Sequence, residues 1–254
     1  MHLYRAFLHC RCELGCQEER QPHPTYKVEQ IRNVSAERYI PALGYAWLAR
    51  LYDPVVRATT REGSFKRKLV EQSGVTDEFQ VLDLACGTGT LAILLKLASP
   101  GAAITGIDGD PRILELAKEK AFRACVEIRF DEGMSFCLPY PAGTFHRVIS
   151  SLFFHHLTRE TKLKTLSEVK RVLKPHGELH IADWGFPANP LMKFASGFVQ
   201  MLDGFETTAD NFDGLLPELI SDAGFEDIEE TSSFNTLFGT IRLHKALKNK
   251  QENQ

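Results

Sequence analysis

The chain has 254 residues, 43% of them hydrophobic, and a formal net charge of −3. This content is enough for a full globular core, and the small net charge carries no signature of binding to nucleic acid or to an anionic membrane. No apolar stretch approaches the roughly 20 residues that span a bilayer, and the N-terminus lacks the apolar core of a secretory signal. We therefore expect a cytoplasmic protein with no integral membrane segment and no nucleic-acid partner.

Residues 1–35 mix charges, prolines and cysteines without a helical or strand period, which predicts a flexible leader. The leader contains Cys10, Cys12 and Cys16. Their Cys-x-Cys-x-x-x-Cys spacing does not supply the paired ligands that a structural zinc site needs. We therefore expect no metal.

Residues 36–78 are predicted to form an N-terminal helical cap. Two stretches, 39–59 and 65–70, place apolar residues mostly three and four positions apart, as on one face of a helix. The apolar residues of the first stretch are Leu43, Trp47, Leu48, Leu51, Val55 and Val56. Two helices are therefore expected before the first strand.

Residues 79–247 alternate strands with helices and are predicted to form the main domain. The expected strands are 81–84, 103–108, 125–130, 145–150 and 178–183. The expected helices are 90–98, one that begins at Pro111, and one around 163–173. This alternation predicts a parallel sheet covered on both faces, with ligands at the carboxyl ends of the strands.

The C-terminal part follows a different pattern. A helix is expected over 212–223, ended by Gly224, and two strand-like runs then follow, joined at 231–233. So short a link permits only an antiparallel hairpin. The predicted fold class is α/β, a Rossmann-like seven-stranded, mostly parallel sheet with a C-terminal antiparallel hairpin.

The stretch VLDLACGTGTLAI, residues 81–93, reads as a buried strand, a glycine turn and a helix, which is the outline of a nucleotide cradle. The turn also fits the G-x-G-x-x-A dinucleotide pattern, and Asp108 lies 19 residues after Gly89, where a ribose-binding acid belongs. NAD is therefore one alternative. Two features count against it. Asp83 would repel a pyrophosphate but would suit a cationic amino acid, and the terminal hairpin is foreign to the six-strand dinucleotide fold.

The segments DLACGTG, GIDGDP and RVLKPHGELHIAD resemble the class I S-adenosylmethionine-dependent methyltransferases, in particular the group that includes the ubiquinone and menaquinone C-methyltransferases. The resemblance covers roughly residues 40–245. It implies S-adenosylmethionine as the cofactor, with Asp83 near the methionine amino group and Asp108 on the ribose hydroxyls. It also implies that Gly87 and Gly89 let the backbone approach the cofactor. Further cofactor-binding positions are expected at Ala85, Gly109, Met134, Ser135 and Ser151.

Two segments depart from the family pattern. Met134 stands where the family usually has an acid that meets the adenine amino group, so adenine is expected to meet apolar contact, or Asp131 or Glu132 instead. The segment 51–56, LYDPVV, lacks the Asn-Asp and Met-Ser elements that follow Tyr-Asp in the quinone enzymes. A quinone substrate is therefore not implied.

His155 and His156 follow the fourth expected strand directly, where a methyl acceptor would approach. Either is a candidate to remove a proton from the acceptor, and a structural role for both is the alternative. Trp184 and Phe186 follow the fifth expected strand and are candidates to line the acceptor pocket, with a place in the core as the alternative.

We interpret the sequence as an S-adenosylmethionine-dependent methyltransferase acting on a small molecule with some lipophilic character, at oxygen, nitrogen or carbon. One alternative is an NAD-dependent oxidoreductase. The other is a non-catalytic S-adenosylmethionine-binding module, for which Met134 is the best support. The acceptor and the oligomeric state are not readable from the sequence.

Overall fold

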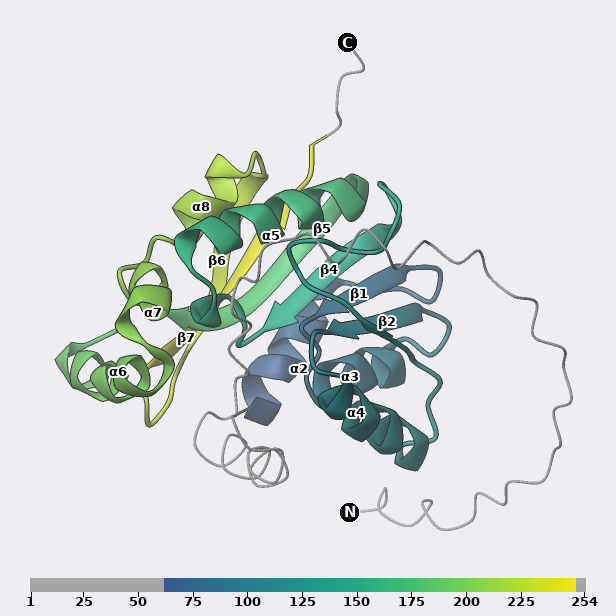
Figure 1. Ribbon diagram of the computed structural model, residues 1–254, viewed down its shortest axis with the longest axis horizontal. Helices are drawn as coiled ribbons and strands as arrows, with labels where there is room; N and C mark the ends of the chain where they lie inside the picture. The colour runs from purple at the N-terminus through teal and green to yellow at the C-terminus, as the bar shows by residue number, and fades with distance from the viewer. Residues whose placement is uncertain (1–61, 250–254) are drawn as a thin grey trace, which may run out of the picture. The chain divides into compact units, whose positions relative to one another are not determined.

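The computed structural model describes residues 62–249 (Figure 1). The predicted leader, the first predicted helix of the cap and the cysteines Cys10, Cys12 and Cys16 lie outside the described residues. Within residues 62–249, no helix is long and apolar enough to cross a membrane.

A seven-stranded sheet forms the centre of the fold. Its strands are β1 (Gln80–Leu84), β2 (Ala103–Asp108), β3 (Arg129–Glu132), β4 (Phe145–Ser151), β5 (Leu173–Gly185), β6 (Glu226–Asn235) and β7 (Thr240–Leu247). Their order is β3-β2-β1-β4-β5-β7-β6. The first five strands in this order pair in parallel, and β7 runs antiparallel to both β5 and β6. The predicted mostly parallel sheet with an antiparallel C-terminal hairpin is confirmed.

Helices cover both faces of the sheet. They are α2 (Glu62–Ser73), α3 (Thr90–Ala98), α4 (Pro111–Arg123), η2 (Phe154–His156), α5 (Arg159–Val172), α6 (Pro190–Asp203), α7 (Phe205–Phe212) and α8 (Leu216–Asp222). Figure 1 shows α5 and α8 over one face and α2, α3 and α4 over the other. Two buried clusters match these layers, one containing Leu166 and Leu219, the other containing Phe65, Leu69 and Leu91. Each buried side chain of this size stabilises the fold by roughly 1.5–3 kcal/mol.

Strand β3 begins four residues later than predicted. Cys125 has a φ of 53° and closes the end of α4, because its N–H donates to the carbonyl of Phe122 and that of Val126 donates to the carbonyl of Ala121. This helix end uses the backbone groups that a strand over 125–128 would need. Pairing with β2 therefore starts only at Arg129.

The hairpin is present, but its turn lies elsewhere. Residues 231–233, which we predicted as the link, belong to β6, and the chain reverses at 236–239 instead. Register shifts along β6, between Glu226 and Glu229 and between Glu230 and Ser232, bend the strand without ending it. The polar Thr-Ser-Ser run is therefore an irregular stretch of an edge strand.

The helix predicted over 212–223 is two helices. Helix α7 ends at Phe212 and α8 begins at Leu216, with Pro217 in its first turn. Because a proline ring clashes with the carbonyl four residues earlier, a single helix through Pro217 is disfavoured, while the first turn of a new helix accepts it.

Strand β5 is longer than predicted and includes the loop before it. His176 adopts a φ of 61°, and the pairing with β4 shifts between Phe145 and Arg147, which accommodates the extra residues. Helices α6 and α7, which the sequence did not predict, follow β5. Helix α7 packs against β5 and η2, at the carboxyl ends of β4 and β5.

Candidate functional site

The predicted cofactor residues gather at the carboxyl ends of the first four strands. Two backbone hydrogen bonds tie the loops there: Cys86 N–H donates to the Ile107 carbonyl, and Gly133 N–H donates to the Asp108 carbonyl. The loops after β1, β2 and β3 therefore form one connected edge.

Asp83 is the most unusual group at this edge. Its side chain is 1% exposed, and its Oδ2 atom has no hydrogen-bond partner among residues 62–249. Burial raises the pKa of Asp83 to about 7, although the Lys66 ammonium and the Ala92 backbone N–H lower it. An ionised carboxylate held away from water with an open oxygen is costly unless a positive group pairs with it.

The turn after β1 brings the backbone close to this carboxylate. Ala85, Gly87 and Gly89 all adopt positive φ, of 55°, 52° and 73°. A Cβ on Gly87 would meet no protein atom within 4 Å, so space is open beside the turn. A Cβ on Gly89 would lie 3.1 Å from both Ala117 and Phe130, so Gly89 allows α4 and β3 to pack closely. Gly87, rather than Gly89, leaves room for a ligand.

Asp108 closes the turn from the side of β2. Its Oδ2 accepts from Gly87 N–H at 2.9 Å, and its Oδ1 accepts from Asp110 N–H at 3.0 Å. Burial raises the pKa of Asp108, while the backbone N–H groups of Asp110, Gly87 and Gly109 lower it. A carboxylate accepts about four hydrogen bonds, so acceptor capacity remains for a ligand's hydroxyls. Gly109 follows directly and is half-buried.

Met134 and Ser135 lie in the loop after β3 and are both half-buried. The Met134 carbonyl accepts from Cys137 N–H, and the Ser135 hydroxyl is 2.9 Å from that of Thr165 on α5. The loop is therefore anchored to α5 through the Ser135 side chain, and Met134 offers an apolar side chain at the end of β3.

Of the two acids proposed for adenine, Asp131 is already engaged. It accepts from the Tyr140 hydroxyl at 3.0 Å and pairs with Arg129 at 2.9 Å. Glu132 is exposed at the end of β3. The geometry thus leaves Glu132 as the more available of the two.

Ser151 ends β4 and is half-buried, paired with Ala182 of β5. The next residue, Leu152, has a φ of 54° and donates its N–H to the Ala182 carbonyl. The chain therefore turns sharply at the carboxyl end of β4 and enters η2.

His155 and Asp183 form a buried pair after this turn. The distance from His155 Nδ1 to Asp183 Oδ1 is 2.5 Å, and the two side chains are 3% and 0% exposed. Asp183 also accepts from the backbone N–H groups of Phe153, His155 and Trp184. Burial alone would raise the pKa of Asp183, but His155 and the Trp184 N–H outweigh it, so the pKa lies below its ordinary value. One carboxylate thus joins β5 to the loop after β4.

His156 packs on His155, with ring centroids 3.9 Å apart. Burial, together with the neighbouring His155, lowers the pKa of His156 to about 3. His156 is therefore neutral at physiological pH. An effective general base has a pKa near the working pH, so this value counts against His156 as the base.

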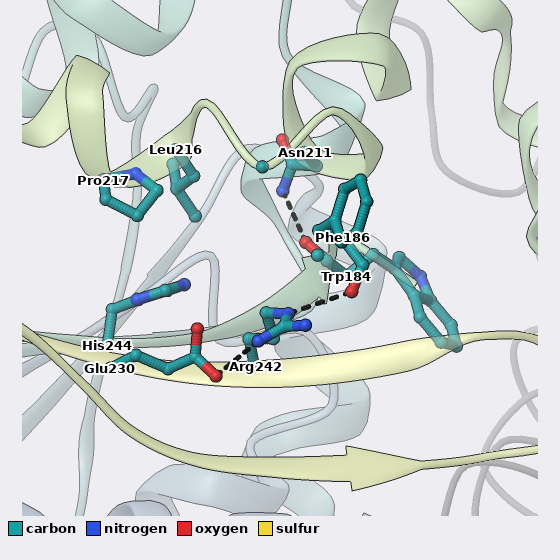
Figure 2. Close-up of a pocket in the computed structure, with 10 residues that line it drawn as sticks. Trp184, Phe186, Asn211, Leu216, Pro217, Glu230, Arg242 and His244 are labelled. Atoms are coloured by element: carbon teal, nitrogen blue, oxygen red, sulfur yellow. Dashed lines mark hydrogen bonds and ion pairs between the residues drawn. The ribbon is translucent and has the colours of Figure 1, made fainter. Parts of the chain in front are cut away.

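A cavity of about 200 Å³ lies at the end of β5, directly after Asp183 in the chain. Figure 2 shows Glu230, Arg242 and His244 from β6 and β7 on one side and Asn211, Leu216 and Pro217 on the other. The end of β5, from Trp184 to Phe186, completes the wall. Both aromatics singled out in the sequence therefore lie at a cavity, and the Trp184 ring also stacks on Phe212 of α7.

Two residues of the site were missed in the sequence. Lys66 acts on Asp83 from α2, which precedes the glycine turn, and its Nζ lies 2.6 Å from Glu62 Oε1. Asp183 was placed in a strand without a role. The signal for Asp183 was present, since an acid at the carboxyl end of a parallel strand matches the placement of Asp83 and Asp108.

Comparison with known proteins gives two kinds of match. Residues 81–177 match a family described as a methyltransferase domain. Demethylmenaquinone methyltransferase of Thermus thermophilus is 37% identical over 135 residues, which are 53% of this chain and 59% of that protein. Ubiquinone/menaquinone biosynthesis C-methyltransferase of Pasteurella multocida is 28% identical over 205 residues, covering 72% of this chain and 75% of that protein. The chain thus spans about 59% of the length of the first of these relatives.

A similar fold occurs in the crystal structure of an S-adenosylmethionine-dependent methyltransferase from Aquifex aeolicus. The TM-score is 0.54 at 20% identity, covering 72% of this chain and 88% of that chain. The nicotinamide-dependent alternative finds no support in these comparisons, and the antiparallel β7 also separates this sheet from the six-strand dinucleotide order.

Proposed function

Because the chain belongs to the class I S-adenosylmethionine-dependent methyltransferases, we propose that it transfers a methyl group from S-adenosylmethionine to a small molecule with lipophilic character. The activity of the relatives supports this proposal, and the site described above supplies its physical basis.

The observation that carries the proposal is the unpartnered, buried oxygen of Asp83 on the strand that leads into the turn where Gly87 leaves open space. S-adenosylmethionine carries an ammonium and a sulfonium but no phosphate, so a carboxylate there is matched to it and mismatched to a dinucleotide. The residues present therefore fit this cofactor.

In this proposal Asp83 binds the amino group, Gly87 lets the backbone approach, and Asp108 binds the ribose hydroxyls. Met134 packs on the adenine and Glu132 is available to its amino group. When bound, the cofactor supplies an activated methyl group on a positively charged sulfur. The protein's part is to align the acceptor with that methyl group and to exclude water.

On the acceptor side, Asp183 pairs with Nδ1 of His155 and so fixes the orientation of the imidazole ring, which a general base needs in order to reach its proton. The neutral His156 adds no positive charge near a cationic donor. Trp184 shares Asp183 with His155 and borders the cavity, so we place part of the acceptor against Trp184 and Phe186.

Two relatives are named for menaquinone or ubiquinone biosynthesis, so a demethylated naphthoquinol belongs in any acceptor panel. The segment 51–56 still departs from the quinone enzymes, and other lipophilic phenols, amines and carbon nucleophiles should be tested alongside.

Calorimetric titration tests the cofactor. We expect binding of S-adenosylmethionine and S-adenosylhomocysteine to the wild-type protein, and a loss of about 1–3 kcal/mol in the Asp108→Ala variant. Tight binding of NADH with no response to S-adenosylhomocysteine would refute the proposal.

Incubation with the acceptor panel and methyl-labelled donor, read by mass spectrometry, tests the reaction. A labelled product identifies the acceptor class and atom. Cofactor binding without any labelled product across the panel would favour the non-catalytic module.

A further inference from the structure

Helix α6 presents an apolar side to solvent. Leu191, Phe194 and Met201 are 69%, 85% and 63% exposed, and their spacing of three and seven residues places them on one side of the helix. Phe205, the first residue of α7, is 63% exposed. We call Leu191, Phe194, Met201 and Phe205 the α6 stripe.

The other side of α6 is already used. Ser196 and Val199 are 3% and 7% exposed, and Val199 joins the buried cluster that contains Phe65 and Trp184. A helix that is apolar on two opposite sides is typical of a helix with a partner on each side. Among residues 62–249 the outer side of α6 has no such partner, because the stripe is exposed.

The sequence contains a segment suited to this stripe. The apolar residues between Leu43 and Val56 recur at helical spacing and need a surface to bury them. The segment ends at Arg61, directly before α2, and Phe65 of α2 belongs to the same buried cluster as Val199 of α6. Pro54 disfavours a single helix through the segment, so residues 43–53 are the part expected to form a helix, and residues 54–61 connect it to α2.

The charge of residues 43–61 favours this segment over a lipid surface as the partner of the α6 stripe. From residue 43 to residue 61 the segment has three arginines, Arg50, Arg57 and Arg61, and one acid, Asp53. Helix α6 exposes Lys193, whereas α7 and the turn after it expose Glu206 and Asp213. The two acids outnumber the lysine, so this region attracts a basic segment and opposes an anionic membrane.

We propose that residues 43–61 dock on the α6 stripe, with their apolar side against Leu191, Phe194 and Met201. The docking itself does not depend on the proposed methyl transfer, and its test does not measure activity.

Tryptophan fluorescence of the full-length protein tests the docking. The chain has two tryptophans, Trp47 in the segment and Trp184, which is 6% exposed. A Trp47→Phe variant isolates the contribution of Trp47 to acrylamide quenching. We expect Trp47 to be shielded in the wild type, and the Phe194→Glu variant to raise its quenching constant several-fold.

Phe122→Glu is the matched control, because Phe122 is an 80% exposed phenylalanine on α4, away from the stripe. This variant should leave Trp47 quenching unchanged. Leu51→Glu, on the segment side, should reproduce the effect of Phe194→Glu. Circular dichroism of each variant checks that the fold is retained, and Leu191→Glu replaces Phe194→Glu if the latter is unfolded.

Three results would overturn the proposal. The first is Trp47 quenching in the wild type as strong as in the urea-unfolded chain. The second is a Phe194→Glu variant that loses binding to phosphatidylcholine vesicles with Trp47 quenching unchanged, which would assign the stripe to a membrane. The third is conversion of a dimer to a monomer by that substitution, again with unchanged quenching, which would assign the stripe to a second copy.

Discussion

At the scale of single residues, the site keeps a buried carboxylate that costs stability in the absence of a ligand. Asp83 is held at the end of β1 by the sheet pairing on both sides, to Gly106 and Ile149, and cannot move toward water. The penalty of its burial is offset when a cation binds. Its protonation should therefore be linked both to cofactor affinity and to stability.

The affinity for S-adenosylmethionine should fall at acid pH. Burial raises the pKa of Asp83 to about 7, and the ammonium pairs with the ionised form, so protons compete with the cofactor below that pH. The dissociation constant should rise by up to about tenfold per pH unit as the pH falls below the pKa. Titration calorimetry across this range checks it. Asp83→Asn should bind weakly with a flat profile, and a flat wild-type profile would contradict the prediction.

The same group affects stability with a definite sign. Its folded-state pKa lies above the ordinary aspartate value of about 4, so the folded protein binds the proton more tightly than the unfolded chain does. The contribution of Asp83 to the free energy of unfolding is therefore greatest at acid pH. It falls as the pH rises toward the raised pKa of this group. Urea denaturation at several pH values checks this. The stability of Asp83→Asn relative to the wild type should be greater at alkaline pH than at acid pH.

The histidine pair predicts two different phenotypes. His155→Gln removes the imidazole partner of the buried Asp183 carboxylate, which keeps its backbone N–H donors, and should cost about 1.5–3 kcal/mol of stability, visible as a lower Tm. His156→Gln removes a neutral ring from a neighbouring position and should leave the Tm nearly unchanged.

Measurement of turnover then distinguishes a histidine that transfers a proton from one that only supports the structure. If one histidine removes a proton from the acceptor, its Gln variant should lose about 10²- to 10⁴-fold in kcat at unchanged cofactor affinity. Full kcat in the folded fraction of both variants would leave positioning as the mechanism.

At the scale of elements, short connections control the site. The turn between β1 and α3 shapes the cofactor edge, and α5 holds both the β3 loop, through Thr165, and α7, through Lys162. The fully buried Lys162 donates to the Thr207 carbonyl and to Asp210. Thus α5 couples the cofactor side to the acceptor side.

Gly87→Ala and Gly143→Ala form a matched pair that tests the turn. Both glycines have positive φ, 52° and 67°, and neither would place a Cβ within 4 Å of another group. Each substitution should therefore cost about 1–2 kcal/mol of stability for the left-handed conformation. Gly87→Ala alone should weaken S-adenosylmethionine binding, because its methyl group enters the open space at the turn after β1. Equal cofactor affinity in the two variants would show that the cofactor does not bind at this turn.

At the scale of the whole molecule, the methyltransferase fold is carried by residues 62–249, and the N-terminal region divides into two parts with different expected roles. Residues 1–35 show no apolar periodicity, whereas residues 43–61 carry apolar residues at helical spacing, which we propose dock on the α6 stripe. Only the second part should contribute to the packed molecule.

Deletion of residues 1–35 should leave the Tm and the cofactor affinity nearly unchanged, since the segment has no apolar surface to bury. Differential scanning fluorimetry and calorimetry of the truncated and full-length proteins check this. One equivalent of zinc in the full-length protein, lost on deletion, would show that Cys10, Cys12 and Cys16 form a metal site after all.

The sequence by itself determined the mostly parallel sheet with its antiparallel hairpin, and the placement of Asp83, the glycine turn and Asp108 at strand ends. These follow from local patterns, since apolar periodicity and the residues at strand ends specify which segments are buried and which end at the edge. Only the tertiary structure decided where β3 starts and where the hairpin turns, because helix ends and strand pairing compete for the same backbone groups. The break before Pro217 was readable from the proline itself. The tertiary structure also decided that Asp183 holds His155 and that Lys66 acts on Asp83. Both interactions join residues distant in sequence, and they depend on how helices and strands pack in space.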